Sequence, residues 1–231
     1  MKLSERYRTV GDLPADIPIF PLRGVLLLPR AALPLNIFEP RYLKMFNDVI
    51  GGKRLVGIIQ TERSTGDAEA ADGHVSQLCK VGCVGRLTAF QEVEDGRLIV
   101  SLAGIARFDV VKELTTEGPY RACRVSYDRF ARDLVAGAGE EDVDREGLLK
   151  TLKLFLEARE LKADWAAISR SPNEMLVNAL AVMSPYGPEE KQALLECIDL
   201  KSRAEVLVAL AEMEMAAGPR GSSGGSGSTL Q

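Results

Sequence analysis

The sequence predicts an α+β fold, with a small β-barrel in the first 130 residues and a helical bundle after it. Apolar, β-branched segments bounded by turn residues recur as far as Tyr127, which is typical of short strands. Beyond residue 130 the apolar residues recur at spacings of three and four, the period of an amphipathic helix. With 46% hydrophobic and 27% charged residues, the composition is that of an ordinary globular protein.

Prolines shape the start of the predicted barrel. Ile17 to Leu22 reads as a strand that contains two prolines, which restricts it to an edge or a barrel rim because proline cannot donate to a ladder. Val25 to Leu28 and Ala32 to Ile37 add short extended pieces. Glu39-Pro40 then opens one helix, with proline at its first position, and Gly51-Gly52 ends it. The predicted buried stripe of this helix is Tyr42, Leu43, Phe46, Val49 and Ile50.

The remaining strand signals complete the β half. Arg54 to Gln60 is apolar enough for a buried strand, and the small, acidic stretch from Ser64 to Ser76 predicts a mobile loop. Further strands are expected at Val81 to Val93, Leu98 to Leu102, Arg107 to Val111 and Arg121 to Tyr127, the first two joined by an Asp95-Gly96 turn. Six or seven strands with one inserted helix favour a barrel, because closure hides strand edges.

About four helices are expected after residue 130. The first contains Leu148 to Leu156, and the second follows Ser171-Pro172-Asn173-Glu174, read as a capping box. Pro188 opens the third, and Ser202 with Glu205 forms a capping box for the fourth, through Met215. The predicted buried face of the second helix is Met175, Leu176, Ala179, Leu180 and Met183.

Charge and cysteine content favour a cytoplasmic protein without bound nucleic acid. Residues 1–130 carry 18 Lys+Arg against 16 Asp+Glu, and residues 131–231 carry 11 against 17, so neither half has the excess of basic residues that nonspecific nucleic-acid binding needs. The first twenty residues contain neither a secretory signal nor a membrane span. The four scattered cysteines are read as reduced thiols.

Several spaced motifs resemble the amino-terminal substrate-binding domain of the Lon family of ATP-dependent proteases. They are Ile17-Pro18-Ile19-Phe20-Pro21-Leu22-Arg23, Leu28-Pro29, Leu33-Pro34-Leu35, Ile37-Phe38-Glu39-Pro40-Arg41-Tyr42, Val81 to Leu87, Asp95-Gly96-Arg97-Leu98 and Gly104 to Phe108. The resemblance covers residues 17 to about 128 and implies a PUA-like β-barrel followed by helices, of a bacterial type. No P-loop ATPase or Ser/Lys peptidase segment is seen, so the chain resembles the stand-alone proteins of this family.

No residue pattern predicts catalysis, a cofactor or a metal. His74, the only histidine, lies in the predicted mobile loop without a positioned partner for a triad. Cys79 and Cys83 are four positions apart on one predicted strand, too far apart along it to share a zinc ion, and no second Cys/His pair is near. We therefore expect a protein that is not an enzyme.

The candidate binding residues lie in the family-like motifs. Arg23, Arg41, Arg86 and Arg107 sit beside apolar residues, where a guanidinium must be paired, and we expect mainly structural bonds to Glu39, Asp109 or backbone carbonyls. Phe38, Tyr42 and Phe46 are expected to fill a core, and any exposed one becomes the leading peptide anchor. The residues predicted to bind peptide are Phe38, Arg41, Tyr42, Arg23 and Arg107.

The expected organisation is an extension at 1–16, the Lon-like barrel domain at 17–130, the helical bundle at 131–217 and a flexible tail with a cleavage scar at 218–231. Asp133 to Asp144 is a possible hinge between barrel and bundle. The first functional hypothesis is non-catalytic binding of unfolded or exposed protein segments, as an adaptor or quality-control factor that works with a protease or chaperone. The alternative is RNA or modified-nucleotide binding, for which PUA-like barrels are also used. An undetected hydrolase is the third.

Overall fold

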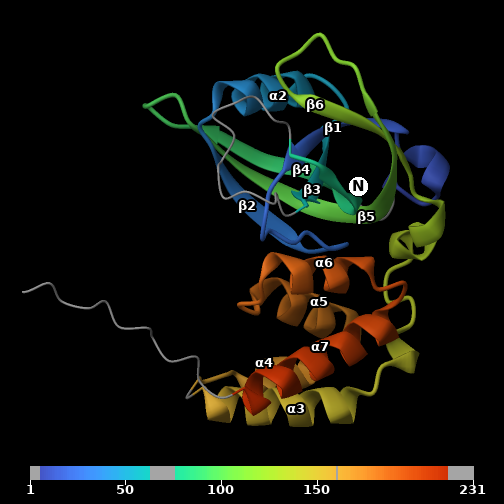
Figure 1. Ribbon diagram of the computed structural model, residues 1–231, viewed down its shortest axis with the longest axis vertical. Coiled ribbons are helices and arrows are strands. Elements are labelled where there is room, and N and C mark those ends of the chain that lie inside the picture. Colours follow the sequence, from blue (N-terminus) through green and yellow to red (C-terminus); the bar gives the residue numbers. More distant parts are fainter. Residues whose placement is uncertain (1–5, 63–75, 160, 218–231) are drawn as a thin grey trace, which may run out of the picture.

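Six strands form one sheet that closes on itself through its longest member, in the computed structural model that describes residues 6–62, 76–159 and 161–217. The strand order is β2-β5-β4-β3-β1-β6, and β6 also pairs with β5, which closes the barrel that the sequence predicts (Figure 1). β1 runs parallel to β3, and all other pairs are antiparallel. The strands are β1 (Asp16–Pro21), β2 (Ala32–Ile37), β3 (Leu55–Thr61), β4 (Leu78–Glu92), β5 (Leu98–Leu114) and β6 (Arg121–Ser126).

The two strands predicted at Leu98 to Leu102 and Arg107 to Val111 are one continuous strand, β5. Gly104 lies within it, where the carbonyl oxygen of Leu28 comes within 2.0 Å of the position that a Cβ would take. This glycine therefore marks a close approach of two backbone segments and does not end the strand. Val25 to Leu28, predicted as extended, joins no ladder, and Leu26, Leu27 and Leu28 are buried in the core.

Helix α2 (Pro40–Ile50) covers one side of the barrel, as the proline at its first position predicts. Its buried residues are Tyr42, Met45, Phe46 and Val49. The prediction missed Met45, and Leu43 and Ile50 are only half-buried. The ring of Phe20 on β1 packs against Tyr42 at 4.2 Å between centroids and against Phe46 at 6.0 Å, which joins the helix to the barrel core.

Five α-helices form the bundle below the barrel, one more than predicted (Figure 1). The short α4 was not foreseen. The helices are α3 (Arg145–Ala158), α4 (Trp165–Arg170), α5 (Asn173–Met183), α6 (Pro188–Glu196) and α7 (Leu200–Ala216), and the short 3₁₀ turns are η1 (Val10–Asp12), η2 (Asp128–Leu134) and η3 (Glu140–Asp142). No helix in these described ranges is long and apolar enough to cross a bilayer.

Both predicted capping boxes are wrong. Pro172 is the residue before α5, and the Ser171 hydroxyl donates to the Ala167 carbonyl instead of capping. For α7 the box lies three residues earlier, because Asp199 accepts from the Ser202 backbone N–H and the Asp199 N–H is bound by the Ser202 hydroxyl.

Polar contacts attach the bundle to the barrel through α6, the helix nearest to the strands in Figure 1. The buried Gln60 amide of β3 donates to the carbonyl of Pro188 and accepts from the Gly24 N–H. Gln192 donates to the carbonyl of Val81, and Lys191 donates to that of Gly24. One apolar core also runs from α2 through the barrel into the bundle. The domain boundaries and the hinge at Asp133 to Asp144 remain predictions.

Three sequence predictions lie outside the described residues: almost all of the loop from Ser64 to Ser76, His74 within it, and the tail at 218–231.

Candidate functional site

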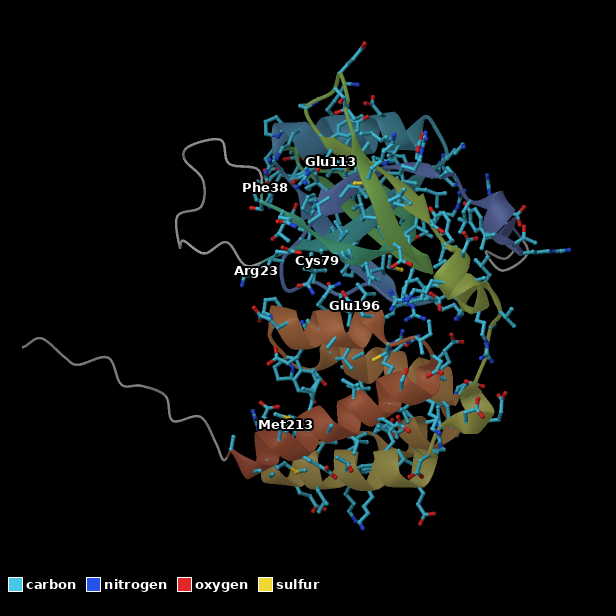
Figure 2. All side chains as sticks on the ribbon, turned by 45° about the vertical axis from the view of Figure 1, so that its right-hand side comes forward. Arg23, Phe38, Cys79, Glu113, Glu196 and Met213 are labelled. Carbon is cyan, nitrogen blue, oxygen red and sulfur yellow. The ribbon has the colours of Figure 1, made fainter. Side chains whose placement is uncertain are left out.

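The five residues predicted to bind peptide do not form one site. Phe38, at the junction of β2 and α2, is 65% exposed and lies on the side of the barrel in Figure 2. Tyr42, four residues later, is buried against Phe20. Phe46 is fully buried as well. Of the three aromatic residues that the sequence singles out, Phe38 alone is available to a partner in this structure.

The exposed arginines among the candidates are bonded to neighbouring carboxylates. Arg41 donates through Nε to Glu39 at 2.9 Å, the partner that the sequence predicts, and its guanidinium lies 4.6 Å above the Tyr42 ring. Arg23 lies 3.7 Å from Glu189 of α6. Such exposed pairs contribute little stability, so both guanidiniums could exchange these partners for others at little cost.

Arg107 lies at the junction of barrel and bundle, where it is 2% exposed. Its Nε and Nη2 donate to the two carboxylate oxygens of Asp133 at 2.8 and 2.7 Å, a bidentate pair. Nη1 donates to the carbonyls of Leu195 and Cys197, and Nη2 also reaches that of Ile198. Backbone carbonyls were among the partners expected for the motif arginines, whereas Asp109, another of them, bonds Arg129.

The contacts of Arg107 explain how helix α6 ends. The last carbonyls of a helix have no partner within it, and α6 has no glycine cap. Arg107 supplies the donors and places a positive charge at the negative end of the helix dipole. The geometry agrees with the structural role for this arginine, and its guanidinium is not accessible to a peptide in this structure.

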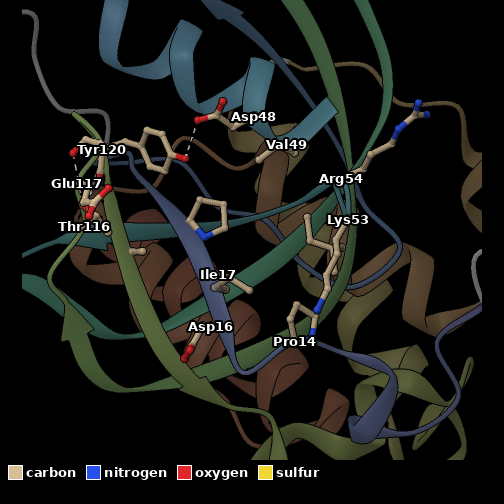
Figure 3. A pocket seen from close by; sticks show the side chains of 14 residues that line it. Pro14, Asp16, Ile17, Asp48, Val49, Lys53, Arg54, Thr116, Glu117 and Tyr120 are labelled. Carbon is tan, nitrogen blue, oxygen red and sulfur yellow. Dashed lines mark hydrogen bonds between the residues drawn. The ribbon is translucent and has the colours of Figure 1, made fainter. Parts of the chain in front are cut away.

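A mixed polar cavity of about 560 Å³ opens on the barrel between the end of α2 and strands β1 and β6 (Figure 3). At one end the Tyr120 hydroxyl donates to Asp48, and at the other lie Lys53 and Pro14. The bond from Lys44 and then that from Tyr120 lower the pKa of Asp48. Asp16, also in the lining, is bonded by Arg124. Its two aspartates therefore have basic partners already.

A groove in the helical bundle, which we call the bundle groove, has a mostly apolar lining. Its volume is about 550 Å³, within the range of ligand pockets. Helices α3, α5 and α7 supply its walls and the segment around α4 closes one end. Its large apolar lining residues are Leu148, Leu152, Phe155, Leu156, Leu161, Ile168, Met175, Leu176, Leu180, Met183, Tyr186, Leu207 and Val208.

Two methionines of α5 project at the rim of the bundle groove. Met175 is 63% exposed and Met183 is 80% exposed. With Ala179 they lie at spacings of four, on one stripe of the helix. The same three residues line a second cavity of about 550 Å³ between α5 and the segment Pro29–Ala32 of the barrel side. The stripe is therefore a ridge between two open cavities, and we call it the methionine ridge.

The sequence assigned the wrong face of α5 to the core. The residues buried in the structure are Leu176, Val177, Asn178 and Ala181, whereas Met175 and Met183 face solvent. The helix is apolar on almost every side, so its spacing alone does not identify the buried face. That all-round apolar character was the available signal, because a helix of this kind either is fully buried or leaves an apolar surface exposed.

The cysteines give no sign of a reactive or metal site. Burial raises the pKa of Cys83, and it raises that of Cys123 to about 11, so both stay protonated thiols at neutral pH. In the part of the chain that the structure describes, no group of three or more His, Cys, Asp or Glu side chains could hold a metal ion.

Known proteins resemble the chain over most of its length. A profile of the family described as the ATP-dependent protease La (LON) substrate-binding domain matches residues 16–212. Lon protease 2 of Myxococcus xanthus is 30% identical over 207 residues, and Lon protease of Parabacteroides distasonis is 30% identical over 224. These matches cover 86% and 91% of this chain, but only 24% and 25% of the two proteases. The chain thus spans about a quarter of the length of these relatives.

Solved structures show the same fold. A Lon N-terminal domain protein from Xanthomonas campestris has a TM-score of 0.59 at 22% identity, and covers 84% of this chain and 97% of its own. The N-terminal domain of a Lon protease from the Mycobacterium avium complex also has a TM-score of 0.59, at 15% identity, with 85% of this chain and 98% of its own covered. The predicted combination of barrel and helices is therefore confirmed.

Proposed function

The chain belongs to the family of the ATP-dependent protease La (Lon) substrate-binding domain, and from this premise we propose that it binds exposed apolar segments of other proteins in the bundle groove. Substrate binding is what the family description states. The segment bound, its place in the groove and a role as adaptor or quality-control factor beside a protease or chaperone are our proposal. In our proposal, the matched region binds a polypeptide and does not change it chemically.

The bundle groove with its methionine ridge is the observation that carries the proposal. An unfolded segment presents apolar side chains in no fixed order, so its receptor needs apolar area that adapts to several shapes. Methionine side chains are unbranched and polarisable, and they repack against different partners at low cost. Met175 and Met183 stand at the edge of two apolar cavities and are free to do so.

Phe38 is the second candidate contact, on the barrel. Arg41, which is ion-paired with Glu39, follows Phe38 three residues later in the chain, and Arg23 lies toward the junction with the bundle. These three residues stay in the proposal as secondary contacts. Tyr42 and Arg107 leave it, because both side chains are buried in other interactions.

The pairing of the barrel arginines supports a polypeptide over the RNA alternative. An RNA-binding surface needs clustered basic groups that are free to meet phosphates. Eight arginines of the first 130 residues each lie within ion-pair distance of a carboxylate: Arg23–Glu189, Arg30–Glu174, Arg41–Glu39, Arg97–Asp95, Arg107–Asp133, Arg121–Glu113, Arg124–Asp16 and Arg129–Asp109. The cytoplasmic location expected from the sequence stays a prediction.

The proposal is tested by titrating the protein into a fluorescently labelled, permanently unfolded protein that has been reduced and carboxymethylated, with anisotropy as the readout. The variant M175Q/M183Q keeps the length and helix propensity of the side chains while making them polar. We expect its Kd to rise by about tenfold or more, since two apolar contacts are lost. M213Q, at an exposed methionine outside the groove, should bind as the unmodified protein does.

Single-stranded RNA is titrated in parallel. Equal affinity of the double variant and the unmodified protein would refute the groove as the site. Salt-sensitive RNA binding without polypeptide binding would replace the proposal by the RNA alternative.

A further inference from the structure

Arg203 of α7 is a buried arginine without a neutralising partner. The residue is 3% exposed. Its Nε donates to the carbonyl of Leu194 at 2.9 Å and its Nη1 to the side-chain oxygen of Asn178 at 2.9 Å. Nη2 has no hydrogen-bond partner among the described residues. Both partners that it has are neutral, so neither its charge nor its last donor is matched by the protein groups around it.

A small cavity of about 30 Å³ adjoins Arg203, at the junction where barrel, η2, α5 and the start of α7 meet. A space of this size holds about one water molecule or one small ion. The cavity is lined by Asn178, Asp199 and Leu200, and by a set of charged side chains at the Arg107–Asp133 pair. Its walls therefore combine charged and amide side chains with apolar ones, and it lies between parts of the chain that are far apart in sequence.

The charges that line this cavity do not cancel. Arg107 is paired with Asp133, and Arg30 is paired with Glu174. The third carboxylate of the lining, Asp199, has its pKa lowered first by bonds from Ser202 and also by the nearby Arg132. Arg107 and Arg30 are thus ion-paired and Arg132 is exposed to solvent, whereas the buried positive charge of Arg203 has no carboxylate partner.

The unpaired, buried charge of Arg203 is expected to lower the stability of the folded protein. A charge taken out of water without a counter-charge loses its hydration and gains little in return. Burial, and next the nearby Arg107, lower the pKa of Arg203 to about 10, so the group is still charged at neutral pH. A water molecule in the cavity would accept a hydrogen bond from Nη2 but would leave the charge unmatched.

We propose that this cavity is a binding site for one small monovalent anion of halide size, which accepts from Nη2 of Arg203 and ties the helical bundle to the barrel. The single surplus charge matches a monovalent ion. The small volume does not fit phosphate or sulfate, which are larger and carry two charges near neutral pH.

Thermal unfolding of the intact chain in chloride tests the proposal. Sodium chloride is titrated against sodium gluconate at constant ionic strength, because gluconate is too large for the cavity. Tm should rise along a saturating curve, by roughly 3–6 °C when chloride is in tenfold excess over its Kd. The R203Q variant should lose this dependence. R170Q should keep it, since Arg170 is exposed and makes no hydrogen bond or ion pair with the described residues.

Crystals of the unmodified protein grown in bromide provide the second measurement, which does not depend on the folding of R203Q. An anomalous peak in the cavity beside Arg203 Nη2 is expected. Absence of that peak would overturn the proposal. So would superimposable Tm curves in chloride and gluconate, and a bromide peak without any halide effect on Tm would mean binding at crystal concentration only.

Discussion

The interior of the barrel and the open face of the helical bundle differ in how closely their side chains pack. In the barrel, a Cβ added to Gly57, Gly82 or Gly104 would meet other atoms at 2.7 Å or less. In the bundle, α3, α5 and α7 leave a groove of about 550 Å³ with apolar walls. A filled barrel is suited to be a rigid support, because close-packed interiors do not deform easily. The open apolar surface, which a partner can fill, lies in the bundle.

Arginine shows the same contrast in its ion pairs. On the barrel, Arg124 and Asp16 form a bidentate pair in which both side chains are about half exposed. At the junction with the bundle, Arg107 and Asp133 form a bidentate pair that is almost fully buried. Breaking the exposed pair should therefore change the free energy of unfolding little, whereas breaking the buried pair should lower it strongly.

The largest effect is expected from Arg107→Met. The change leaves Asp133 as a buried charge without a partner and removes the donors to the last carbonyls of α6. The free energy of unfolding should fall by about 3–5 kcal/mol. Urea unfolding measures it, and Arg124→Met is the matched exposed control, with a loss of about 1 kcal/mol or less. Equal losses in the two variants would contradict the contrast.

The second-largest effect is expected from Gly104→Ala. The free energy of unfolding should fall by about 2–3 kcal/mol, because the new methyl group meets the Leu28 carbonyl of the neighbouring backbone. The Leu28 segment cannot withdraw without straining the neighbouring bonds from the Arg30 N–H to the Gly104 carbonyl and from the Gly104 N–H to the Ala31 carbonyl. Gly51→Ala is the control: its nearest atom is 3.8 Å away. Thermal unfolding compares the two, and a tolerated alanine at 104 would show that the barrel is less tightly packed than described.

Asp199→Ala should cost about 1 kcal/mol at neutral pH, the usual worth of a helix N-cap. Bonds from the Ser202 backbone and hydroxyl lower the pKa of Asp199 from its ordinary 3.8. A lowered pKa means that the contribution is present above pH 3.8 and is lost as pH falls through the lower folded value. Urea unfolding of both proteins from pH 7 to pH 2.5 measures the difference, which should shrink toward zero. A constant difference would disprove the charged cap.

The smallest effect is expected from Phe38→Ala on polypeptide binding. If the bundle groove supplies the main contact, loss of one exposed ring on the barrel should raise the Kd about twofold. This corresponds to about 0.4 kcal/mol of binding free energy. The anisotropy titration with unfolded protein measures it, alongside M175Q/M183Q. A larger loss for Phe38→Ala than for the double methionine variant would move the site to the barrel.

The sequence alone predicted the structure correctly where a local rule determines it, as at the starts of two helices. Proline at position 40 started α2 and proline at position 188 started α6, because each position needs no backbone donor. It was insufficient where distant segments decide. Two strands were predicted on either side of Gly104, whereas this glycine lies inside the single strand β5, beside the Leu28 carbonyl from a segment far away in sequence. The partner of Arg107 is Asp133 for the same reason.

The candidate site was the part least accessible to sequence reasoning. Phe38 was recognised as a possible anchor, and its exposure depends on tertiary packing. Met175 and Met183 were assigned to a core, because a helix that is apolar on all sides does not reveal which side its neighbours cover. The packing of α3 and α7 against α5 decides this, and no local pattern contains that information.

The central claim is that the bundle, not the barrel, receives the apolar segment. Methyl NMR of the ¹³C-methionine-labelled protein tests it most directly, because the six methionines include Met175 and Met183 at the ridge, the buried Met45 beside the barrel and the exposed Met213 outside the groove. On titration with an unfolded polypeptide, we predict saturable shifts for Met175 and Met183 and little change for Met45 and Met213. Unchanged ridge resonances at saturation would contradict the account.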